Sequence, residues 1–497
     1  MRILLAASEA VPFAKTGGLA DVASGLSKAL SARGHEVTLV LPYYRQAMSE
    51  AIPRQPTGRF LETSLGDLKV RAVVLESRLE GSDARVLLID HPHYFDRSGL
   101  YVQQGSDYPD NCERFCAFSR LVMETARAFH LQPDIVHAND WQTGLIPALQ
   151  QIEYRRQSGF ERTAAVLTIH NMAYQGTFWQ QDMHLTGLGH EYFNWNQMEH
   201  YGQLNLLKTG IVFSDAVTTV SPTYAREIQT DRFGCGLEGV LQHHGSKLTG
   251  ILNGIDIDVW NPESDPAIPM PYSKENVKPG KAACKKKLQR RFNLSENPFT
   301  PLCGMISRMS EQKGFDLIQG CINDLLREDI QLVFLGTGDS HYEDFIRDLA
   351  SKRPDKVAAM IGFDETLAHQ IEAGSDIYLM PSRFEPCGLN QMYSQAYGTV
   401  PVVHAVGGLV DSVIDCTPET LADRIATGFH FQEYTSDAFL ARLKDALAAY
   451  RDDDVWDVLI DNGMSCDWSW NRSAEVYEQT YERALASLPN NPPSTPE

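Results

Sequence analysis

Lys15-Thr16-Gly17-Gly18-Leu19 lies between a short apolar run, residues 3–7, and a segment with the spacing of an amphipathic helix, residues 19–30. A strand that ends, turns on two glycines and opens a helix leaves backbone N–H groups unpaired at the helix start. These groups attract anions, and the ammonium of Lys15 strengthens the attraction. Adjacent glycines at such a junction also occur where only tight packing is needed. The stretch therefore predicts a β-α unit whose turn is either an anion site or a packing feature.

The chain is long enough for two large α/β domains, because its 497 residues and 55.6 kDa exceed what one hydrophobic core supports. Hydrophobic residues at 43% and charged residues at 22% are ordinary for a globular protein. The net charge of −20 and the pI near 5.2 argue against a nucleic-acid or anionic-membrane partner, since both require a basic surface. A neutral polymer remains compatible with this charge.

The cysteines and the N-terminus favour a cytoplasmic protein. The nine cysteines are scattered without a Cys-x-x-Cys pair, so neither a disulfide framework nor a zinc site is indicated. Ser8-Glu9 ends the first apolar run well short of a signal-peptide core, and we expect residues 3–7 to be a strand. No run approaches the roughly 18 apolar residues of a membrane span.

Alternating strands and helices predict a parallel sheet in each half of the chain. In the first half the expected strands are 37–41, 70–75, 85–90, 134–137, 165–169, 216–221 and 248–252, with a helix over 113–128. In the second half they are 302–307, 331–335, 357–361, 376–380 and 400–403, with helices over 281–291, 436–450 and 471–485.

Five prolines from Pro262 to Pro279 predict a linker. The expected division is an N-terminal domain 1–261, a linker 262–280, a C-terminal domain 281–470, a C-terminal helix 471–487 and a flexible tail 488–497.

Polar residues follow several of the expected strands in the first half. Asp140, His170 and Asn253 each lie just beyond a buried strand. Because ligands of open parallel sheets bind at the carboxyl ends of the strands, these three are candidates for a site. Taken singly, His170 is equally explained as a satisfied polar residue and Asp140 as a turn former.

The second half has a cationic pair, Arg308 and Lys313, just past a strand. A planar guanidinium and a compact ammonium suit a diphosphate, although a solvated surface pair would have the same sequence. The glycine turn at 336–339 is more typical of structure than of ligand binding.

Glu385 follows another strand in the run 381–389 and precedes a helix, where its carboxylate would stay ionised. A helix-capping role is the alternative, and Cys387 fits either a packed residue or a substrate contact. Asp256-Ile257-Asp258 resembles a metal motif without the matching nucleotide fold, so we expect no metal. The sequence contains no obvious nucleophilic triad.

Four motifs together resemble the bacterial glycogen synthase and plant starch synthase family. They are 15–19, Arg308 with Lys313, Glu385-Pro386-Cys387-Gly388 and 404–409, and the resemblance runs from residue 1 to about 485. It implies an α/β protein with two facing Rossmann-like domains (GT-B type) and the active site in the interdomain cleft. The implied reaction is transfer of glucose from ADP-glucose to the non-reducing end of an α-1,4-glucan, with retention and without metal or cofactor.

The resemblance also implies roles for single residues. Catalytic roles fall on Arg308, Lys313, Glu385, His170 and Asp140, and substrate binding falls on Lys15, Gly17, Gly18, Asn253, Phe363, Gly388 and Leu389. Phe363 occupies the position whose ring packs on adenine. Many related transferases have a second Glu eight residues after Glu385, where this chain has Tyr393, so the ribose contact stays unassigned. We favour the leaving phosphate as the base, with a covalent route through Glu385 as the alternative.

Other functions remain open at this stage. A related transferase using UDP-glucose or a small acceptor would carry similar motifs. A catalytically idle glucan-binding protein would need aromatic platforms but no diphosphate-binding cations. A glucan phosphorylase would need a lysine-bound pyridoxal phosphate and a much longer chain.

Overall fold

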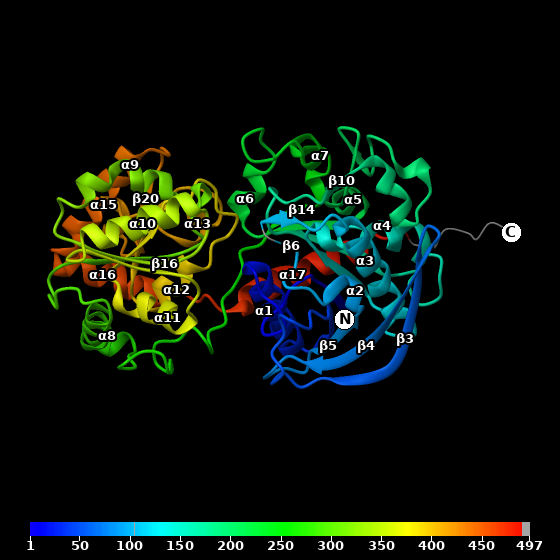
Figure 1. Cartoon of the computed structure of the whole chain (residues 1–497), viewed down its shortest axis with the longest axis horizontal. Helices are drawn as coiled ribbons and strands as arrows, with labels where there is room; N and C mark the ends of the chain where they lie inside the picture. The colour runs from blue at the N-terminus through cyan, green and yellow to red at the C-terminus, as the bar shows by residue number, and fades with distance from the viewer. Residues whose placement is uncertain (104, 490–497) are drawn as a thin grey trace. The chain divides into compact units, whose positions relative to one another are not determined.

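The computed structural model describes residues 1–103 and 105–489, and it divides into two α/β units (Figure 1). Unit 1 consists of Met1–Gly254 together with the C-terminal stretch that begins at Trp470. Unit 2 consists of Ile255–Ser469. Each unit is built on its own sheet with helices on both faces.

Unit 1 has a nine-stranded sheet in the order β14-β13-β9-β8-β1-β2-β5-β4-β3. Its strands are β1 Arg2–Ala6, β2 Glu36–Pro42, β3 Gln55–Leu65, β4 Leu68–Arg78, β5 Arg85–Asp90, β8 Ile135–Asn139, β9 Ala164–Ile169, β13 Ala216–Thr219 and β14 Leu248–Gly250. All neighbours are parallel except β3 with β4 and β4 with β5. The parallel strands are nearly continuous apolar runs, as expected where both faces are covered.

The strand order reverses at β1. Ala6 at its carboxyl end pairs with Val40 of β2 on one side and with Ala138 of β8 on the other. Loops that leave a sheet at such a reversal turn away from each other and open a crevice, which is the usual ligand site of this fold class. The loops after β1 and β8 carry Lys15 and Asp140.

Helices cover both faces of this sheet. They are α1 Gly18–Ala32, α2 Pro92–Phe95, α3 Asn111–Ala128, α4 Ile146–Leu149, α5 Leu206–Phe213, α6 Pro222–Glu227, α7 Glu238–His243 and α17 Trp470–Ala486. Short strands outside the main sheet are β6 Val102–Gln103, β7 Ser106–Asp107, β10 Thr177–Phe178, β11 Glu199–His200 and β12 Gln203–Asn205.

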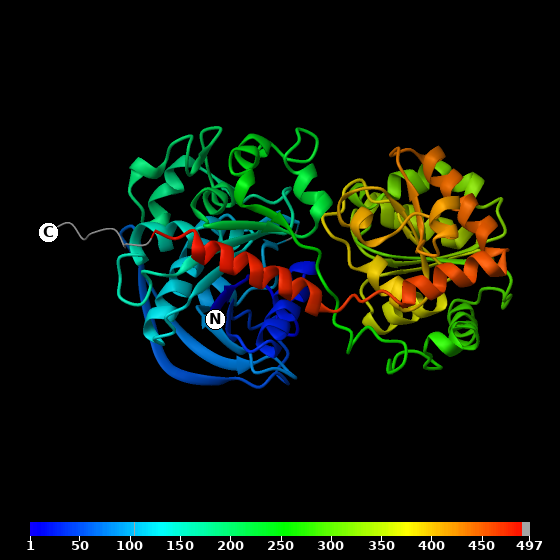
Figure 2. The same cartoon turned by 180° about the vertical axis from the view of Figure 1, so that it is seen from behind.

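The C-terminal helix α17 belongs to unit 1, and Figure 2 shows it in red across that unit. Trp470 packs where α1 has Gly25, at which a Cβ would lie 2.0 Å from the indole nitrogen. Farther along the helix, the hydroxyl of Tyr481 is 2.9 Å from Nδ1 of the buried His137 on β8. These contacts join residues more than 340 positions apart in the chain.

Unit 2 has a six-stranded, wholly parallel sheet in the order β17-β16-β15-β18-β19-β20. Its strands are β15 Leu302–Ile306, β16 Gln331–Gly336, β17 Val357–Ile361, β18 Ile377–Met380, β19 Val400–His404 and β20 Phe429–Phe431. Its helices are α8 Val277–Arg291, α9 Phe315–Leu325, α10 Ser340–Lys352, α11 Glu365–Gly374, α12 Asn390–Ala396, α13 Gly407–Ser412, α14 Pro418–Ala422, α15 Ser436–Tyr450 and α16 Asp453–Met464. The order reverses between β15 and β18, and the loops after these strands carry Arg308 and Glu385.

The predicted linker 262–280 lies inside unit 2. Its prolines interrupt regular structure, but Tyr272 is buried and donates to the carbonyl of Tyr397 at 2.8 Å. Asp265 accepts from the hydroxyl of Tyr397 at 2.6 Å and lies 2.8 Å from the ring of His369. The chain passes from one unit to the other near residues 254–255 and again near 469–470.

The expected C-terminal helix 471–487 is present as α17, but it is part of unit 1 and not a separate element. Leu488, which was expected to begin the flexible tail, is only 5% exposed and joins the core of unit 1. Residues 490–497 of that tail lie outside the described residues. No helix within the described ranges combines the length and apolarity needed to cross a bilayer.

Candidate active site

The loop after β1 places Lys15 at the surface, where its ammonium is 2.7 Å from the carboxylate of Asp21 on α1. The backbone N–H of Thr16 donates to Glu9, the Gly17 N–H lies 3.3 Å from the same carboxylate oxygen, and the Thr16 hydroxyl donates to its other oxygen at 2.6 Å. Glu9 is 3% exposed and also accepts from Tyr101 at 2.6 Å. The turn therefore binds an anionic group, and in this structure that group is the Glu9 carboxylate, which contacts two of the backbone N–H groups.

Sequence reasoning missed Glu9. An acidic side chain in the loop just after the first apolar run was a local sign of a possible site residue. Its partner Tyr101 is 92 positions away, and no pattern in the sequence links the two. A ligand contact at the Gly17 N–H would require Glu9 to release it.

Asp140 and His170 come together at the ends of β8 and β9. Oδ1 of Asp140 accepts from the backbone N–H of His170 at 2.7 Å. Burial raises the pKa of the Asp140 carboxyl to about 7, although backbone N–H groups of His170 and Asn171 oppose the rise. The backbone of Asp140 has φ 56°, which is rare for a residue with a side chain and marks a tight turn.

Burial also lowers the pKa of the His170 imidazole to about 3. The ring is therefore neutral near pH 7. Asn253, in the loop after β14, is 5% exposed, and its side-chain oxygen has no hydrogen-bond partner among the described residues. A buried acceptor without a partner suits a hydrogen bond from a hydroxyl of a ligand, because leaving a buried polar atom unpaired costs free energy.

In unit 2 the structure brings Lys313 and Glu385 together. Nζ of Lys313 is 2.5 Å from Oε2 of Glu385, and the hydroxyl of Ser382 donates to the same oxygen at 3.0 Å. The two charged side chains are 22% and 8% exposed. Glu385 is not a helix cap, because α12 begins at Asn390 and its N-cap position is Leu389.

Arg308 lies on the same loop as Lys313 and is exposed. Its guanidinium donates to the side-chain oxygen of Gln312 at 2.8 Å. Glycines fix this loop against its neighbours. A Cβ at Gly314, where φ is 82°, would lie 2.1 Å from the carbonyl of Pro381, and one at Gly336 would lie 1.9 Å from the carbonyl of Ser307.

Gly407 and Gly408, the first two residues of α13, contact the backbone of the Glu385 loop. The Gly408 N–H donates to the carbonyl of Glu385 at 3.1 Å, and a Cβ at Gly407, where φ is 47°, would lie 2.0 Å from that carbonyl. The buried His404 has Nδ1 2.7 Å from the carbonyl of Ser382. The glycines of the motif 404–409 are thus explained by close backbone contact.

The remaining predicted residues occupy different surroundings. Gly388 has φ 72° and lies with Leu389 just before α12, so both precede the first turn of that helix. Phe363 follows β17 and is 82% exposed. Cys387 is buried, and Tyr393 stacks on Trp260 with ring centroids 3.9 Å apart. The Tyr393 ring is therefore committed to packing.

No group of three or more potential metal ligands occurs among the described residues. In the predicted weak motif, Asp256 accepts from the backbone N–H of Asp258 at 3.1 Å, as in an ordinary turn. Within those same ranges, no disulfide joins any of the nine cysteines.

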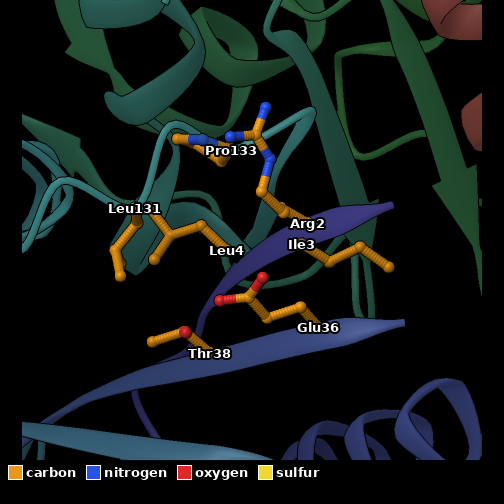
Figure 3. A pocket seen from close by; sticks show the side chains of 7 residues that line it. All are labelled: Arg2, Ile3, Leu4, Glu36, Thr38, Leu131 and Pro133. Carbon is orange, nitrogen blue, oxygen red and sulfur yellow. The ribbon is translucent and has the colours of Figure 1, made fainter. Parts of the chain in front are cut away.

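A small hollow lies in unit 1 at the amino ends of the strands, opposite to the carboxyl ends that carry Asp140 and His170 (Figure 3). It is lined by Arg2, Ile3, Leu4, Glu36, Thr38, Leu131 and Pro133, at the amino ends of β1 and β2. Its volume of about 10 Å³ has room for one water molecule at most. It is no candidate for a substrate site.

Comparison with known proteins decides the family. The starch synthase catalytic domain model matches residues 2–243, and the model for glycosyl transferases group 1 matches residues 286–457. The glycogen synthase of Anaeromyxobacter sp. (strain Fw109-5) is 48% identical over 98% of this chain and 100% of its own length. Glycogen synthase 1 of Methylococcus capsulatus is 44% identical over 98% of this chain and 97% of its own. The chain belongs to the glycogen synthase and starch synthase family.

Solved structures agree with this membership. The catalytic domain of starch synthase IV from Arabidopsis thaliana, bound to ADP and acarbose, has 34% identity and a TM-score of 0.90 and covers 97% of this chain and 99% of that one. A sucrose-phosphate synthase from Thermosynechococcus elongatus, with 16% identity and a TM-score of 0.58 over 98% of this chain and 99% of that one, shares the fold. The predicted fold class, α/β with two Rossmann-like domains of GT-B type, is confirmed for this member of the glycogen synthase family.

Proposed function

We propose that the protein is a glycogen synthase that transfers glucose from ADP-glucose to the non-reducing end of an α-1,4-glucan with retention of configuration. The observation that carries the proposal is the pair formed by Lys313 and the buried Glu385 where the strand order of unit 2 reverses, with Arg308 on the same loop as Lys313. A buried carboxylate paired with an ammonium, together with a guanidinium on the loop of that ammonium, suits a ligand with a diphosphate at one end and sugar hydroxyls at the other.

Each charged group has a distinct part in the proposed reaction. As the bond between glucose C1 and the diphosphate oxygen breaks, negative charge grows on the departing diphosphate, and Arg308 and Lys313 stabilise it. Glu385 accepts hydrogen bonds from glucose hydroxyls. The 4-hydroxyl of the acceptor forms the new bond to C1 on the same face, and its proton passes to the leaving phosphate.

Residues of unit 1 complete the proposed set. Lys15 and the amides of Gly17 and Gly18 bind the diphosphate and glucose, His170 and Asn253 meet the transferred sugar, and Asp140 lies toward the acceptor. Positive charge for the diphosphate then comes from side chains, so we expect activity to survive EDTA. A cytoplasmic location remains part of the proposal.

A neutral glucan acceptor fits the surface of unit 1. The excursion between β9 and α5 carries four well-exposed aromatic side chains: Tyr174, Trp179, Trp195 and Tyr201. A hollow of about 500 Å³ in the same excursion is lined by Gln180, Gln181, Met183, His184, Leu188 and His190. Aromatic faces and uncharged polar groups suit sugar rings better than they suit a charged polymer.

Glucose incorporation into glycogen, measured with ADP-glucose and UDP-glucose side by side and with an EDTA arm, tests the proposal. We expect higher turnover with ADP-glucose, because a purine offers more stacking area to Phe363. Equal or better turnover with UDP-glucose contradicts the donor assignment, and no incorporation from either indicates an idle glucan-binding protein.

Phe363→Ala and Phe299→Ala form a matched pair for the adenine contact. Both phenylalanines are more than 80% exposed, but Phe299 precedes β15 and so lies at the amino end of that strand. Phe363→Ala should raise KM for ADP-glucose several-fold and Phe299→Ala should leave it unchanged. Equal effects of the two variants would remove Phe363 from the donor site.

A further inference from the structure

The imidazole of His170 makes one side-chain contact that the sequence did not predict. Its Nε2 is 2.9 Å from Oδ1 of Asn139, the last residue of β8. Asn139 is 1% exposed, and its backbone N–H donates to the hydroxyl of Thr143 at 2.6 Å. The side chain that faces His170 is therefore held by a packed strand end.

The second contact of Asn139 fixes the direction of the first. Its Nδ2 donates to the carbonyl of Ala6 at 3.0 Å. A carbonyl only accepts, so the amide nitrogen must face Ala6 and the amide oxygen must face His170. Because that oxygen also only accepts, the ring proton of His170 must be on Nε2.

The other ring nitrogen then carries a lone pair. Among the described residues, Nδ1 of His170 has no hydrogen-bond partner, and the residue is partly exposed. The charged groups around the ring do not protonate it. The Asp140 carboxylate accepts a hydrogen bond from the backbone N–H of His170 and not from its ring, and the nearby charge of Glu9 contributes to raising the pKa of Asp140. The neighbouring His137 is itself kept neutral by burial. Burial also keeps the pKa of His170 near 3.

We propose that Asn139 is a positioning residue that holds His170 as the neutral Nε2-protonated tautomer, so that Nδ1 accepts a hydrogen bond from a sugar hydroxyl. The identity of that group as a hydroxyl of the transferred glucose rests on the proposed function. The tautomer itself follows from the contacts with Asn139 and Ala6 and does not depend on the substrate. Asn139 acts through His170 and touches no reacting atom.

Nitrogen NMR of the protein labelled with ¹⁵N-histidine tests the tautomer without any substrate. The His170 signals are those lost in His170→Ala. In the wild type we expect a protonated Nε2 and an unprotonated Nδ1 at every pH from 8 down to 5. Asn139→Leu, which removes the acceptor, should give a mixture of both tautomers. A protonated Nδ1 in the wild type, or a His170 spectrum unchanged by Asn139→Leu, overturns the proposal.

Steady-state kinetics separate positioning from mere packing. Asn139→Leu should lower kcat by about 10- to 100-fold, the usual cost of losing a group that orients a functional histidine. In the His170→Ala background the same substitution should change kcat less than twofold, because its effect passes through the ring. Equal fold-losses in both backgrounds would mean a purely structural role.

Asn462→Leu is the matched control. Asn462 on α16 also donates its amide to a backbone carbonyl, that of Ala426, at 2.8 Å, and it contacts no predicted site residue through that bond. Its effect on kcat should be small and equal in both backgrounds. If ADP-glucose is not the donor, the wild type is inactive in this assay while the NMR result stands, so the two proposals fail separately.

Discussion

At the residue scale, the contact between Lys313 and Glu385 says most about the chemistry. An exposed ion pair contributes little to stability, but here the carboxylate is 8% exposed and its partner 22%. Such burial costs desolvation energy that only good geometry and further hydrogen bonds offset, and Ser382 supplies one of them. A buried charge pair at the carboxyl ends of parallel strands fits a binding site better than a stabilising bridge.

Arg308→Ala and Lys313→Ala should each lower kcat far more than they raise KM for ADP-glucose. In the proposed reaction each cation interacts most strongly with the charge that develops on the departing diphosphate, so its loss should cost about 10²–10³ in rate, or roughly 3–4 kcal/mol. The double variant should lose less than the product of the two, since both act on one group. Steady-state kinetics on folded variants provide the measurement.

Arg327→Ala is the control for this pair. The side chain of Arg327 is 77% exposed. Among the ion pairs of the described residues, Arg327 pairs only with Asp324, three positions earlier in the chain. Its removal should change the barrier by less than about 1 kcal/mol. A near-normal kcat in either Arg308→Ala or Lys313→Ala would exclude that residue from catalysis.

Asp140→Asn should change how stability depends on pH. The pKa of Asp140 is raised to about 7, so the folded state holds a proton that the unfolded state has already lost above about pH 4. This carboxyl therefore makes the wild type less stable as pH rises from about 4 to 7. The variant lacks that loss, and it should gain stability relative to the wild type over the same range, by up to a few kcal/mol. Urea unfolding midpoints at pH 5 and pH 8 test this, and a difference between the proteins that is constant with pH would contradict it.

Residues that the sequence predicted and residues that it missed differ in the range of their contacts. Arg308, Lys313 and Glu385 lie in the loops that follow two apolar strands, so strand periodicity alone placed them near the carboxyl ends of a sheet. Glu9 and Asn139 are held in place by hydrogen bonds to Tyr101 and Ala6, which are 92 and 133 positions away. Pairing over such distances is decided by tertiary packing, and no local pattern records it.

At the element scale, the loops of unit 2 pack closely against one another at positions where glycine allows two backbones to touch. The strands were predictable because buried parallel strands are continuous apolar runs. The place of segment 262–280 in unit 2 was not predictable, because proline content indicates where helices and strands end but not whether a segment is buried. Tyr272 and Asp265 bind it to unit 2 through contacts with Tyr397 that the composition does not reveal.

Gly407→Ala should impair catalysis through the Glu385 loop. A Cβ at this position would lie 2.0 Å from the carbonyl of Glu385, and φ of 47° disfavours any side chain, so the loop must shift. We expect kcat to fall at least tenfold and stability by about 1–3 kcal/mol. Kinetics together with thermal melts would show both effects.

Gly239→Ala provides the comparison for this substitution. Gly239 lies in helix α7, and a Cβ there meets nothing within 4 Å, so alanine should be neutral or slightly stabilising. If Gly407→Ala behaves in the same way, close contact is not the reason for glycine at that position.

At the scale of the whole molecule, the last helix completes the first unit. The core of unit 1 contains strands from the first half of the chain together with Trp470, Ala474, Tyr477, Tyr481, Ala484 and Leu488. Unit 1 therefore cannot finish folding until residues beyond unit 2 are available. Domain boundaries drawn along the sequence miss this, because a core is defined by contacts and not by continuity.

Ending the chain after Ser469 should unfold unit 1, whereas ending it after residue 489 should not. Burying each large side chain of α17 contributes roughly 1.5–3 kcal/mol, so losing Trp470, Tyr477 and Tyr481 alone removes an amount comparable with the 5–15 kcal/mol by which typical domains are stable. His137 would also lose its bond to Tyr481 and remain buried without it. Unit 2 keeps its own core, so we expect a partial loss of cooperative unfolding in calorimetry and a complete loss of activity. A chain ending at Ser469 that melts and works like the full protein would show that α17 is dispensable to unit 1.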